Sequence, residues 1–576
     1  MTINGYEASS KPDFGTPGLN GAAVHDIIIV GAGPCGLAVA ARLREANPAA
    51  IFTDEEHQRF HWMNRHGKKM ALKHVKSGRT SSATHGTVRG YDMAVLDANH
   101  DDWMGRWNQL FHTFHITHLR SPMFWHLDPN SRDGLLSKAY EEQRSGELLE
   151  IKGCVGKEIS KHMKKRRRNY TGGKGDSRVP INERDRNDYF TPSQSLFSEH
   201  CKDVVAHYSL HGTGLVHKET VLDIAYSSVP GVPIADEKLF TVRTDAGIRY
   251  SRVVILAVGP GNQPRIPRIP GMTSGSEGAA PPSFPQACHA MQIRHFPDPV
   301  VKRRIAANRH TNILVIGGGL TSAQLADLAI RKGAGTVWHM MRGPLRVKPF
   351  DVDLCWMGKF RNVEQSRFWQ ADSDEERLGL MKEARGGGSV TPIYRRILKQ
   401  HVTSGKLRLF EKTTLHEARF QKEDRGGEDG PSSSGLWHVK TSPEVEGLPP
   451  MDYIYFATGI ETDFRTLPYL QTMMESHPID GYGGFPCLND DLMWKDDVPL
   501  FVAGRLAALK LGPAAPNLGG ARIAAERIAW GVEEVMRKAS GLDPDGGTPW
   551  ATARESLVDY ATGTGNMFSG LVEVSS

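Results

Sequence analysis

Short apolar runs alternate with helix-favouring stretches along the chain, which predicts an α/β protein, and the pattern is clearest at two places. Residues 27–30 form a β-branched run typical of a buried parallel strand, and residues 37–46 are rich in Ala, Leu and Arg, which favour a helix. The apolar run 312–316 and a helix predicted to end near Gly333 repeat this plan. Strand, turn and helix in this order are typical of a Rossmann-like dinucleotide-binding unit.

The first unit breaks at three glycines, and each has a physical task. Gly31 permits a tight turn, Gly33 lets the backbone approach a pyrophosphate, and Gly36 lets the helix lie against the strand. Pro34 suits the first helical turn, whose free amides would face the phosphates. The pattern predicts a dinucleotide site, and the alternative is an accidental glycine turn in an ordinary α/β unit.

A carboxylate is expected at the end of the next strand of this unit. We predict that strand at roughly residues 50–53, followed by Asp54 and Glu55. An acid about 20 residues after the turn binds ribose hydroxyls in this fold, and either Asp54 or Glu55 could do so.

The second unit carries Gly317 and Gly319, with the small residue Ser322 in the third place. Its next strand, 337–341, ends not in an acid but in Arg342. A carboxylate there would repel a 2′-phosphate, whereas a guanidinium can form two hydrogen bonds with one. The first unit is therefore predicted to bind FAD and the second NADPH. For Arg342 alone, the alternative is a solvated surface arginine.

Two further apolar strands, within 249–271 and 450–464, stop at Gly259 and Gly459. Each would close a nucleotide-binding sheet and let the chain cross to the other domain. The predicted fold is therefore α/β with two Rossmann-like domains, the NADPH domain inserted in the FAD domain. In chain order we expect a flexible tail (1–24), the first part of the FAD domain (25–274, with a basic insertion near 153–186), the NADPH domain (275–450), the last part of the FAD domain (451–540) and a C-terminal extension (541–576).

The last part of the chain predicts a strand, a loop and a long helix over residues 499–535. Backbone amides at the start of this helix, around Asn517 and Leu518, would face the flavin.

Composition argues against a membrane-spanning or nucleic-acid-binding protein. The chain of 576 residues is 39% hydrophobic and 24% charged, as in an ordinary globular protein, and it has no apolar run of about 18 residues that would span a membrane. The net charge of +6 is too diffuse to indicate nucleic-acid binding. The basic run 161–168 could be a nuclear-localisation or anion-binding patch, and a solvated insertion is the alternative.

The six cysteines are scattered, without a C-x-x-C pair. This argues against the chemistry of thioredoxin and glutathione reductases, which pass electrons from flavin to a disulfide. It also suits a reducing, cytoplasmic location.

The two glycine motifs, the triplet 457–459 and the C-terminal strand, loop and helix resemble the class B flavoprotein monooxygenases that use FAD and NADPH. The resemblance covers about residues 25–535. Within that superfamily, residues 114–129 and 187–201 look most like the N-hydroxylating branch, the ornithine- and lysine-type monooxygenases. The chain is also similar to the oxidative-stress-induced growth inhibitor proteins. Where the N-hydroxylating enzymes often carry a lysine near the flavin, this chain has Phe114.

The resemblance implies a monooxygenase that reduces FAD with NADPH, forms a flavin peroxide with O2 and inserts one oxygen atom into a small nucleophilic substrate, an amine above all. It places three candidate catalytic residues near the flavin, Arg120, Asn262 and Asn517. Three further residues are expected to contact it, Trp103, Trp107 and His118. Trp103 and Trp107, four positions apart, would share a helix face, although core packing is the commoner use of such a pair.

Other expectations concern metals and partners. Histidines between 112 and 126 alternate with Phe and Arg rather than with further ligands, so no metal site is expected. We expect a small-molecule substrate and O2 as partners, with homo-oligomers possible. Two alternatives to the oxygenase stay open, a regulatory or redox-sensing flavoprotein and an NADPH oxidase that releases peroxide.

Overall fold

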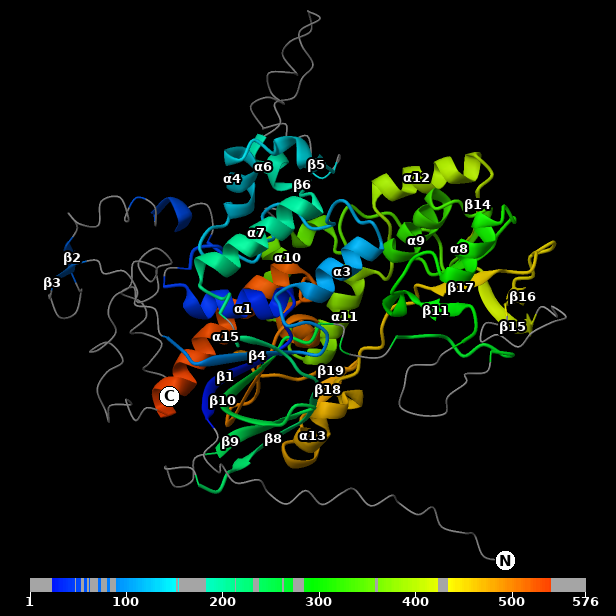
Figure 1. Ribbon diagram of the computed structural model, residues 1–576. Helices are drawn as coiled ribbons and strands as arrows, with labels where there is room; N and C mark the ends of the chain where they lie inside the picture. Colours follow the sequence, from blue (N-terminus) through cyan, green and yellow to red (C-terminus); the bar gives the residue numbers. More distant parts are fainter. Residues whose placement is uncertain are drawn as a thin grey trace, which may run out of the picture.

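The protein is described by a computed structural model (Figure 1). It describes residues 23–46, 48–52, 56–59, 62, 71–73, 80–82, 90–151, 154, 183–212, 214–231, 238–259, 261, 264–272, 284–357, 361–422 and 434–539. The predicted site residues Asp54, Glu55 and Asn262 and the basic run 161–168 lie outside this set.

The first sheet has a parallel centre, because β1 pairs in parallel with β10 on one side and β4 on the other. Its middle strands are buried apolar runs, as expected for strands covered on both faces. β21 and β7 extend the parallel part, while β20 and the pair β8–β9 add antiparallel strands. In sheet order the strands are β20 (Met493–Lys495), β21 (Val498–Val502), β10 (Ile248–Leu256), β1 (Val24–Val30), β4 (Met93–Asp97) and β7 (Val216–Lys218), with β9 (Lys238–Thr244) paired to β10 and β8 (Val221–Ser228) to β9.

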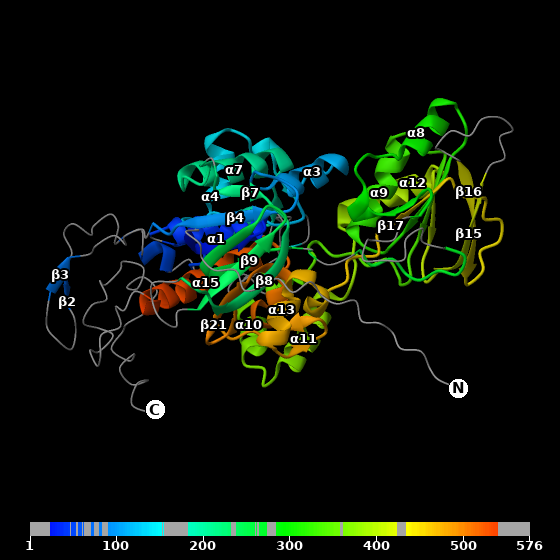
Figure 2. The same ribbon diagram turned by 60° about the horizontal axis from the view of Figure 1, so that its bottom comes forward.

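The second sheet is parallel throughout and forms a separate lobe (Figure 2). Its order is β11 (Ala287–His289), β17 (Tyr453–Phe456), β12 (Asn312–Ile316), β13 (Thr336–Met340) and β14 (Leu407–Phe410). The hairpin β15 (Thr414–Lys422) and β16 (Gly435–Ser442) lies beside it. Since β10 precedes and β21 follows this lobe in the chain, the predicted fold, one Rossmann-like domain inserted in another, is confirmed. The second sheet extends past the expected boundary at residue 450, because β17 belongs to it.

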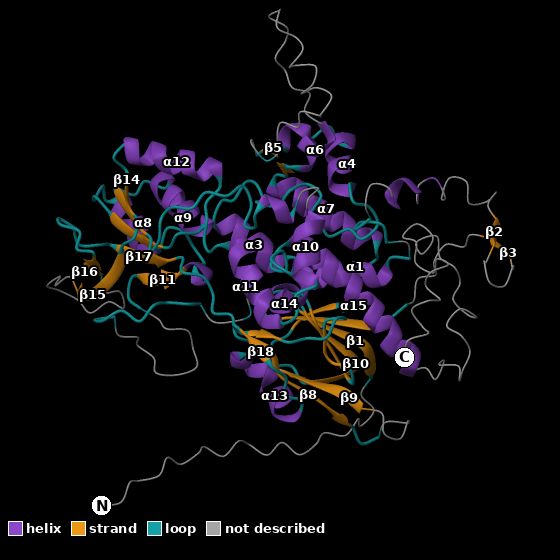
Figure 3. Cartoon of the chain, turned by 180° about the vertical axis from the view of Figure 1, so that it is seen from behind, coloured by secondary structure: helices purple, strands orange, loops and turns teal. Residues whose placement is uncertain are grey.

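Helices cover both sheets, and α1 (Pro34–Arg44) and α15 (Leu518–Ala539) lie side by side against the first (Figure 3). A buried ion pair of 2.5 Å between Arg42 and Glu526 joins them. The second lobe carries α8 (Pro299–Ala306), α9 (Leu320–Arg331) and α12 (Pro392–Thr403). The other helices are α3 (Gly105–Thr113), α4 (Gly134–Glu141), α6 (Glu183–Asp188), α7 (Gln194–His207), α10 (Arg361–Trp369), α11 (Asp374–Arg385), α13 (Gln471–Ser476) and α14 (Ala508–Leu511).

Three short strand pairs lie outside the two sheets: β2 (Ala71–Lys73) with β3 (Thr80–Ser82), β5 (Leu149–Glu150) with β6 (Phe190–Thr191), and β18 (Gly481–Tyr482) with β19 (Phe485–Pro486). Within the described part of the chain, no helix has the length and apolar character needed to cross a membrane.

Each lobe buries apolar residues that come from the other lobe's part of the chain. Residues 350–384 belong to the inserted part of the chain, yet Phe350, Phe368 and Leu380 are buried in the core of the first lobe. In the other direction, Phe114 at the end of α3 is buried among apolar residues of the second lobe. The position where the resembled enzymes often carry a flavin-side lysine is therefore part of an apolar core.

Candidate functional site

The two glycine turns have the same backbone geometry. In the first, the Gly31 amide donates to the Leu96 carbonyl at 2.7 Å, and the Ala257 amide donates to Val30 at 2.8 Å. These bonds place the turn at the carboxyl ends of β1, β4 and β10, the edge of a parallel sheet where nucleotides bind.

The second turn repeats these contacts one for one. The Gly317 amide donates to Met340 at 2.9 Å, and the Ala457 amide donates to Ile316 at 2.7 Å. The turn lies at the carboxyl ends of β12, β13 and β17, so each lobe has an equivalent candidate dinucleotide site.

Glycine is required at the first position of both turns. Gly31 has φ +112° and Gly317 has φ +151°, a region that side chains rarely adopt. A Cβ at Gly31 would lie 2.5 Å from the Ala257 carbonyl oxygen, and one at Gly317 would lie 2.4 Å from that of Ala457. The residue that follows β10 in the first lobe, and the one that follows β17 in the second, therefore contact the turn directly.

The middle glycines face open space instead. A Cβ at Gly33 would have no neighbour within 4 Å, and one at Gly319 would have only the Gly388 Cα at 3.9 Å. Gly33 and Gly319 precede α1 and α9, whose first amides receive no side-chain cap from them. Pro34 occupies the first turn of α1. A pyrophosphate could therefore come close to the backbone at Gly33 and Gly319 and accept hydrogen bonds from the first amides of each helix.

The third small residue packs the helix against its strand. A Cβ at Gly36 would lie 2.0 Å from the Gly31 carbonyl oxygen, so no side chain fits there. Ser322 is fully buried, and its hydroxyl donates to the Gly319 carbonyl at 2.7 Å. The packing role predicted for both positions matches their surroundings.

The structure corrects the predicted second strand of the first unit. Residues 48–52 form no strand, and the strand that pairs with β1 is β4, with Val30 opposite Leu96. Residues 45–92 lie between α1 and β4, so the strand that pairs with β1 begins later than the usual spacing predicts. The apolar run MAVLD at 93–97, ending in an acid, was the available signal.

Asp97 ends β4 and takes the place expected for Asp54 or Glu55. One carboxylate oxygen accepts the Ala32 amide of the glycine turn at 3.1 Å. The other accepts the amides of Asn99 and His100 at 2.9 and 3.1 Å. These bonds hold the carboxylate beside the turn, where the ribose hydroxyls of FAD would lie.

Arg342 lies one residue beyond the corresponding place in the second unit. Met341 follows β13 as Asp97 follows Leu96 in the first unit, and Met341 is buried. Arg342 comes next and is exposed, and no carboxylate within the described ranges is paired with it. The end of β13 thus offers a free cation where the end of β4 offers an anion.

Gly459 lies at the crossover between the lobes. It has φ +85°, and its carbonyl accepts the Arg265 amide at 3.0 Å. Pro264 and Ile460 form an antiparallel bridge, so the outgoing and returning chains run side by side. Contact of Gly459 with a cofactor stays a prediction.

Asn517 caps the long C-terminal helix. Its side-chain oxygen accepts the Gly520 amide at 3.3 Å, and its amide nitrogen lies 3.5 Å from Asp351. Leu518, the first residue of α15, is buried. The Trp125 ring packs on the next residue, since a Cβ at Gly519 would lie 2.6 Å from it.

Arg120 connects the lobes. Its guanidinium donates to the Ser389 carbonyl and hydroxyl at 3.1 and 2.8 Å, to the Lys348 carbonyl at 3.1 Å and to the Phe350 carbonyl at 2.8 Å. Burial lowers the pKa of Arg120 to about 10, so it remains a cation at neutral pH. Because a Cβ at the neighbouring Gly388 would lie 3.1 Å from the Gly319 Cα, Arg120 holds a loop that lies against the second glycine turn.

The aromatic candidates lie in protein contacts. Trp103 precedes α3, so it does not share a helix face with Trp107 as predicted, and its indole nitrogen donates to the Leu210 carbonyl at 2.9 Å. Trp107 stacks on Phe111 with ring centroids 4.7 Å apart. His118 forms a bridge with Ser193, and burial lowers its pKa. Contact of these three with flavin stays a prediction.

All six cysteines are free, and burial raises the pKa of each thiol, to about 12 for Cys35 inside the first turn. Thiols with raised pKa values are poor nucleophiles. Across the described ranges, no three His, Cys, Asp or Glu side chains gather in a way that could hold a metal ion.

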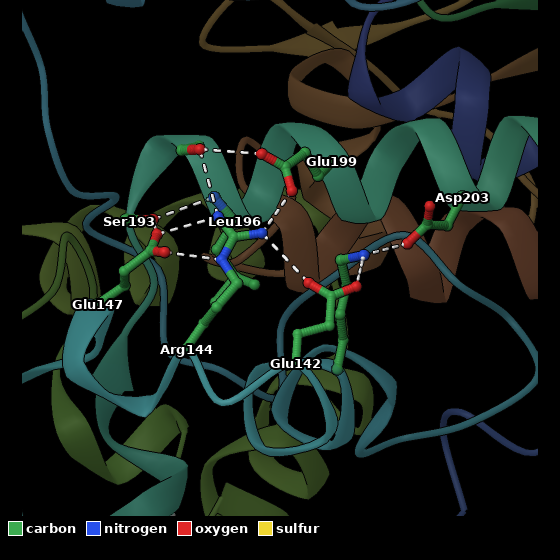
Figure 4. Close-up of polar contacts among 9 residues, drawn as sticks. Glu142, Arg144, Glu147, Ser193, Leu196, Glu199 and Asp203 are labelled. Carbon is green, nitrogen blue, oxygen red and sulfur yellow. Dashed lines mark hydrogen bonds and ion pairs between the residues drawn. The ribbon is translucent and has the colours of Figure 1, made fainter.

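A polar network beside His118 fixes the start of α7 (Figure 4). Arg144 donates to both carboxylate oxygens of Glu147, at 2.7 and 3.0 Å, and also pairs with Glu199. The Ser193 hydroxyl donates to Glu147 while it accepts the Leu196 amide at 3.0 Å, which caps α7.

We expect this network to weaken in acid. Hydrogen bonds from Arg144 and Ser193 lower the pKa of Glu147 from its ordinary 4.5 to about 2. A lowered pKa gives stability that is present above pH 4.5 and is lost as the pH falls toward 2. For this partly exposed carboxylate we expect about 0.5–1 kcal/mol.

The measurement is urea unfolding of the parent and Glu147→Gln between pH 7 and 3. The parent should be more stable at pH 7, and the difference should shrink in acid. Glu141→Gln, at an exposed position near the end of α4, is the control and should match the parent. A difference that does not change with pH would contradict the assignment.

Comparison with known proteins establishes the fold. No protein-family model and no curated protein matches the sequence. The ornithine N-hydroxylase of Kutzneria sp. 744, described with FADred, NADP+ and L-orn, is 15% identical, with TM-score 0.55 over 90% of this chain and 100% of that chain. L-lysine 6-monooxygenase from Pseudomonas syringae is 15% identical, with TM-score 0.51 over 89% and 99%. The FAD-bound cadaverine monooxygenase of desferrioxamine biosynthesis from Erwinia amylovora is 12% identical, with TM-score 0.52 over 89% and 95%.

Proposed function

We propose that this protein is an FAD- and NADPH-dependent monooxygenase that inserts one atom of O2 into a small nucleophilic substrate, with amine N-hydroxylation as the favoured reaction. The observation that carries the proposal is the pair of equivalent glycine turns: Asp97 accepts an amide of the first, and the exposed cation Arg342 comes two residues after Met340, whose carbonyl accepts an amide of the second. An acid suits the ribose of FAD and a cation suits the 2′-phosphate of NADPH. The fold shared with an ornithine N-hydroxylase, an L-lysine 6-monooxygenase and a cadaverine monooxygenase supports the reaction class.

Each residue then has a defined task. Bound FAD would accept a hydride from NADPH and activate O2. The amides after Gly33 would bind its pyrophosphate, and Asp97 would hold its ribose. The amides after Gly319 would bind the NADPH pyrophosphate, with the 2′-phosphate on Arg342. Arg120 is a positioning residue, because it holds residues 348–350 and 389 over the first lobe.

The substrate class rests on a further point. Since Phe114 is packed in the second core, the chain lacks the lysine that often lies near the flavin in the ornithine and lysine enzymes. We therefore propose a small amine without assigning it to ornithine or lysine, acting in the cytoplasm.

The test uses the full-length flavoprotein. We expect NADPH to reduce the bound flavin without oxygen, and NADH to do so far more slowly. With oxygen present, a matching amine should give a product heavier by one oxygen atom and couple its formation to NADPH consumption. Failure of both coenzymes to reduce the flavin would favour a regulatory flavoprotein. Peroxide equal to the NADPH consumed, with every amine tried, would favour an oxidase.

Coenzyme choice should depend on Arg342. Hydrogen bonds to a charged group contribute about 1.5–3 kcal/mol, so Arg342→Ser should raise the KM for NADPH roughly 10- to 100-fold. The kcat/KM with NADH should stay within about twofold, since NADH has no 2′-phosphate. Flavin-reduction rates against coenzyme concentration measure both values.

The matched control is Arg408→Ser, which removes an exposed arginine from the neighbouring strand β14. It should leave both coenzymes unaffected. Equal losses for NADPH and NADH in Arg342→Ser would show that this arginine does not bind the 2′-phosphate.

A further inference from the structure

A pocket of about 490 Å³ lies where the end of α3 meets the segment that leads into α8. Figure 2 shows α3 extending from the first lobe toward the second. The residues that line the pocket are His112, Thr113, His115, Arg294, His295, Phe296, Pro297, Pro299, Lys302 and Arg303. Its volume is in the range of small-molecule sites, which measure about 300–1,000 Å³.

The lining is strongly cationic. It includes Arg294, Lys302 and Arg303 together with three histidines, and none of these ten residues is an aspartate or glutamate. Arg294 and Lys302 are exposed and, among the described residues, neither has an ion-pair partner within 4.0 Å. Arg303 donates to the Pro299 carbonyl at 3.4 Å.

The surroundings add positive charge. His112 and His115 stack with ring centroids 6.3 Å apart. Burial, followed by the charges of Lys332, Arg331 and His112, lowers the pKa of His115. Asp298, the nearest acid in the chain, caps α8 by accepting the Val300 amide at 2.9 Å and does not line the pocket. Two arginines and a lysine in a lining that has no carboxylate favour a bound anion.

The pocket is separate from the candidate coenzyme sites. Neither glycine turn contributes to its lining, and neither do Asp97 or Arg342. It draws its residues from the end of α3 and the residues just after it, and from α8 of the second lobe and the segment that leads into it. A ligand bound here would touch both lobes.

We propose that this pocket binds a small polyanion, a molecule with two or more phosphate or carboxylate groups, at a site distinct from the FAD and NADPH sites. Two arginines and a lysine in one lining suit several oxygen atoms on one compact ligand, because guanidinium groups form paired hydrogen bonds with such oxyanions. The volume of about 490 Å³ is that of a small-molecule site.

The test is calorimetric titration of the FAD-loaded protein, saturated with NADP+, with inorganic pyrophosphate and, separately, citrate. We expect saturable binding of at least one probe, and the stronger probe distinguishes a phosphate from a carboxylate ligand. Arg294→Ser should weaken that binding about tenfold, as expected for the loss of a charge-assisted hydrogen bond. NADPH-driven flavin reduction, measured in parallel, tests the proposed function independently.

The matched control is Arg309→Ser, which removes an exposed arginine from the loop after α8, outside the pocket. It should leave probe binding unchanged within about twofold. Equal weakening by both substitutions would show diffuse attraction rather than a site. Binding that NADP+ abolishes, or no binding at millimolar probe, would overturn the proposal. So would an affinity for oligonucleotides that grows with their length and exceeds that for both probes.

Discussion

Replacement of Gly33 by alanine is expected to weaken FAD binding severely while the apoprotein stays folded. The added methyl group would meet no protein atom within 4 Å, so it would occupy the space through which the pyrophosphate approaches the backbone. Forcing an extra methyl into a filled site costs about 1–3 kcal/mol, which corresponds to roughly 10- to 100-fold weaker binding. The apoprotein should lose about 1 kcal/mol or less, because alanine is a poorer N-cap than glycine.

Titration of the apoprotein with FAD and thermal unfolding without FAD measure the two effects separately. Gly319→Ala is the matched variant in the second turn, where a Cβ also has room. It should keep its FAD and lose NADPH-driven reduction instead. Unchanged FAD affinity in Gly33→Ala would exclude the first turn as the pyrophosphate site. Gly31→Ala, by contrast, should destabilise the apoprotein itself, since its Cβ would lie 2.5 Å from a backbone oxygen.

Loss of the Arg304 side chain is expected to destabilise the second lobe by about 3–5 kcal/mol, the usual effect of leaving a buried charge unpaired. Arg304 on α8 and Asp452 before β17 form a buried ion pair, each with a side chain 7% exposed. Arg304 also donates to the Gly435 carbonyl at 3.0 Å. Asp452 accepts the Asn312 amide at 2.6 Å, which connects the pair to β12.

The measurement is denaturant unfolding of Arg304→Met beside the parent. Arg309→Met, at an exposed position, is the control and should change the free energy of unfolding by less than about 0.5 kcal/mol. The double variant Arg304→Met/Asp452→Asn should recover part of the loss, because asparagine removes the stranded charge and still accepts from Asn312. Parent-like stability in Arg304→Met would contradict this account of the pair.

The surroundings of several site residues could not have been predicted from spacing. Arg120 was selected as a catalytic candidate, yet its guanidinium is occupied by carbonyls of residues 348, 350 and 389. Those partners lie more than two hundred positions away in the chain. Trp103 is similar, because the carbonyl that accepts from its indole belongs to Leu210, after α7. Such contacts depend on how distant segments pack.

The glycine turns were predictable because strand, turn and helix follow one another directly, so each turn depends on residues within a few positions of it. The same local patterns predicted an acid for the first glycine unit and a cation for the second. They also predicted that the second nucleotide-binding domain is inserted in the first. Folding alone decided which strand pairs with β1, because residues 45–92 separate α1 from β4 and local pattern does not encode pairing across an insertion. It therefore also decided that Asp97, at the end of β4, lies beside the first turn. Burial of Phe350, Phe368 and Leu380 in the first lobe has the same cause: apolar side chains specify that a segment is buried, and only the assembled lobes specify where.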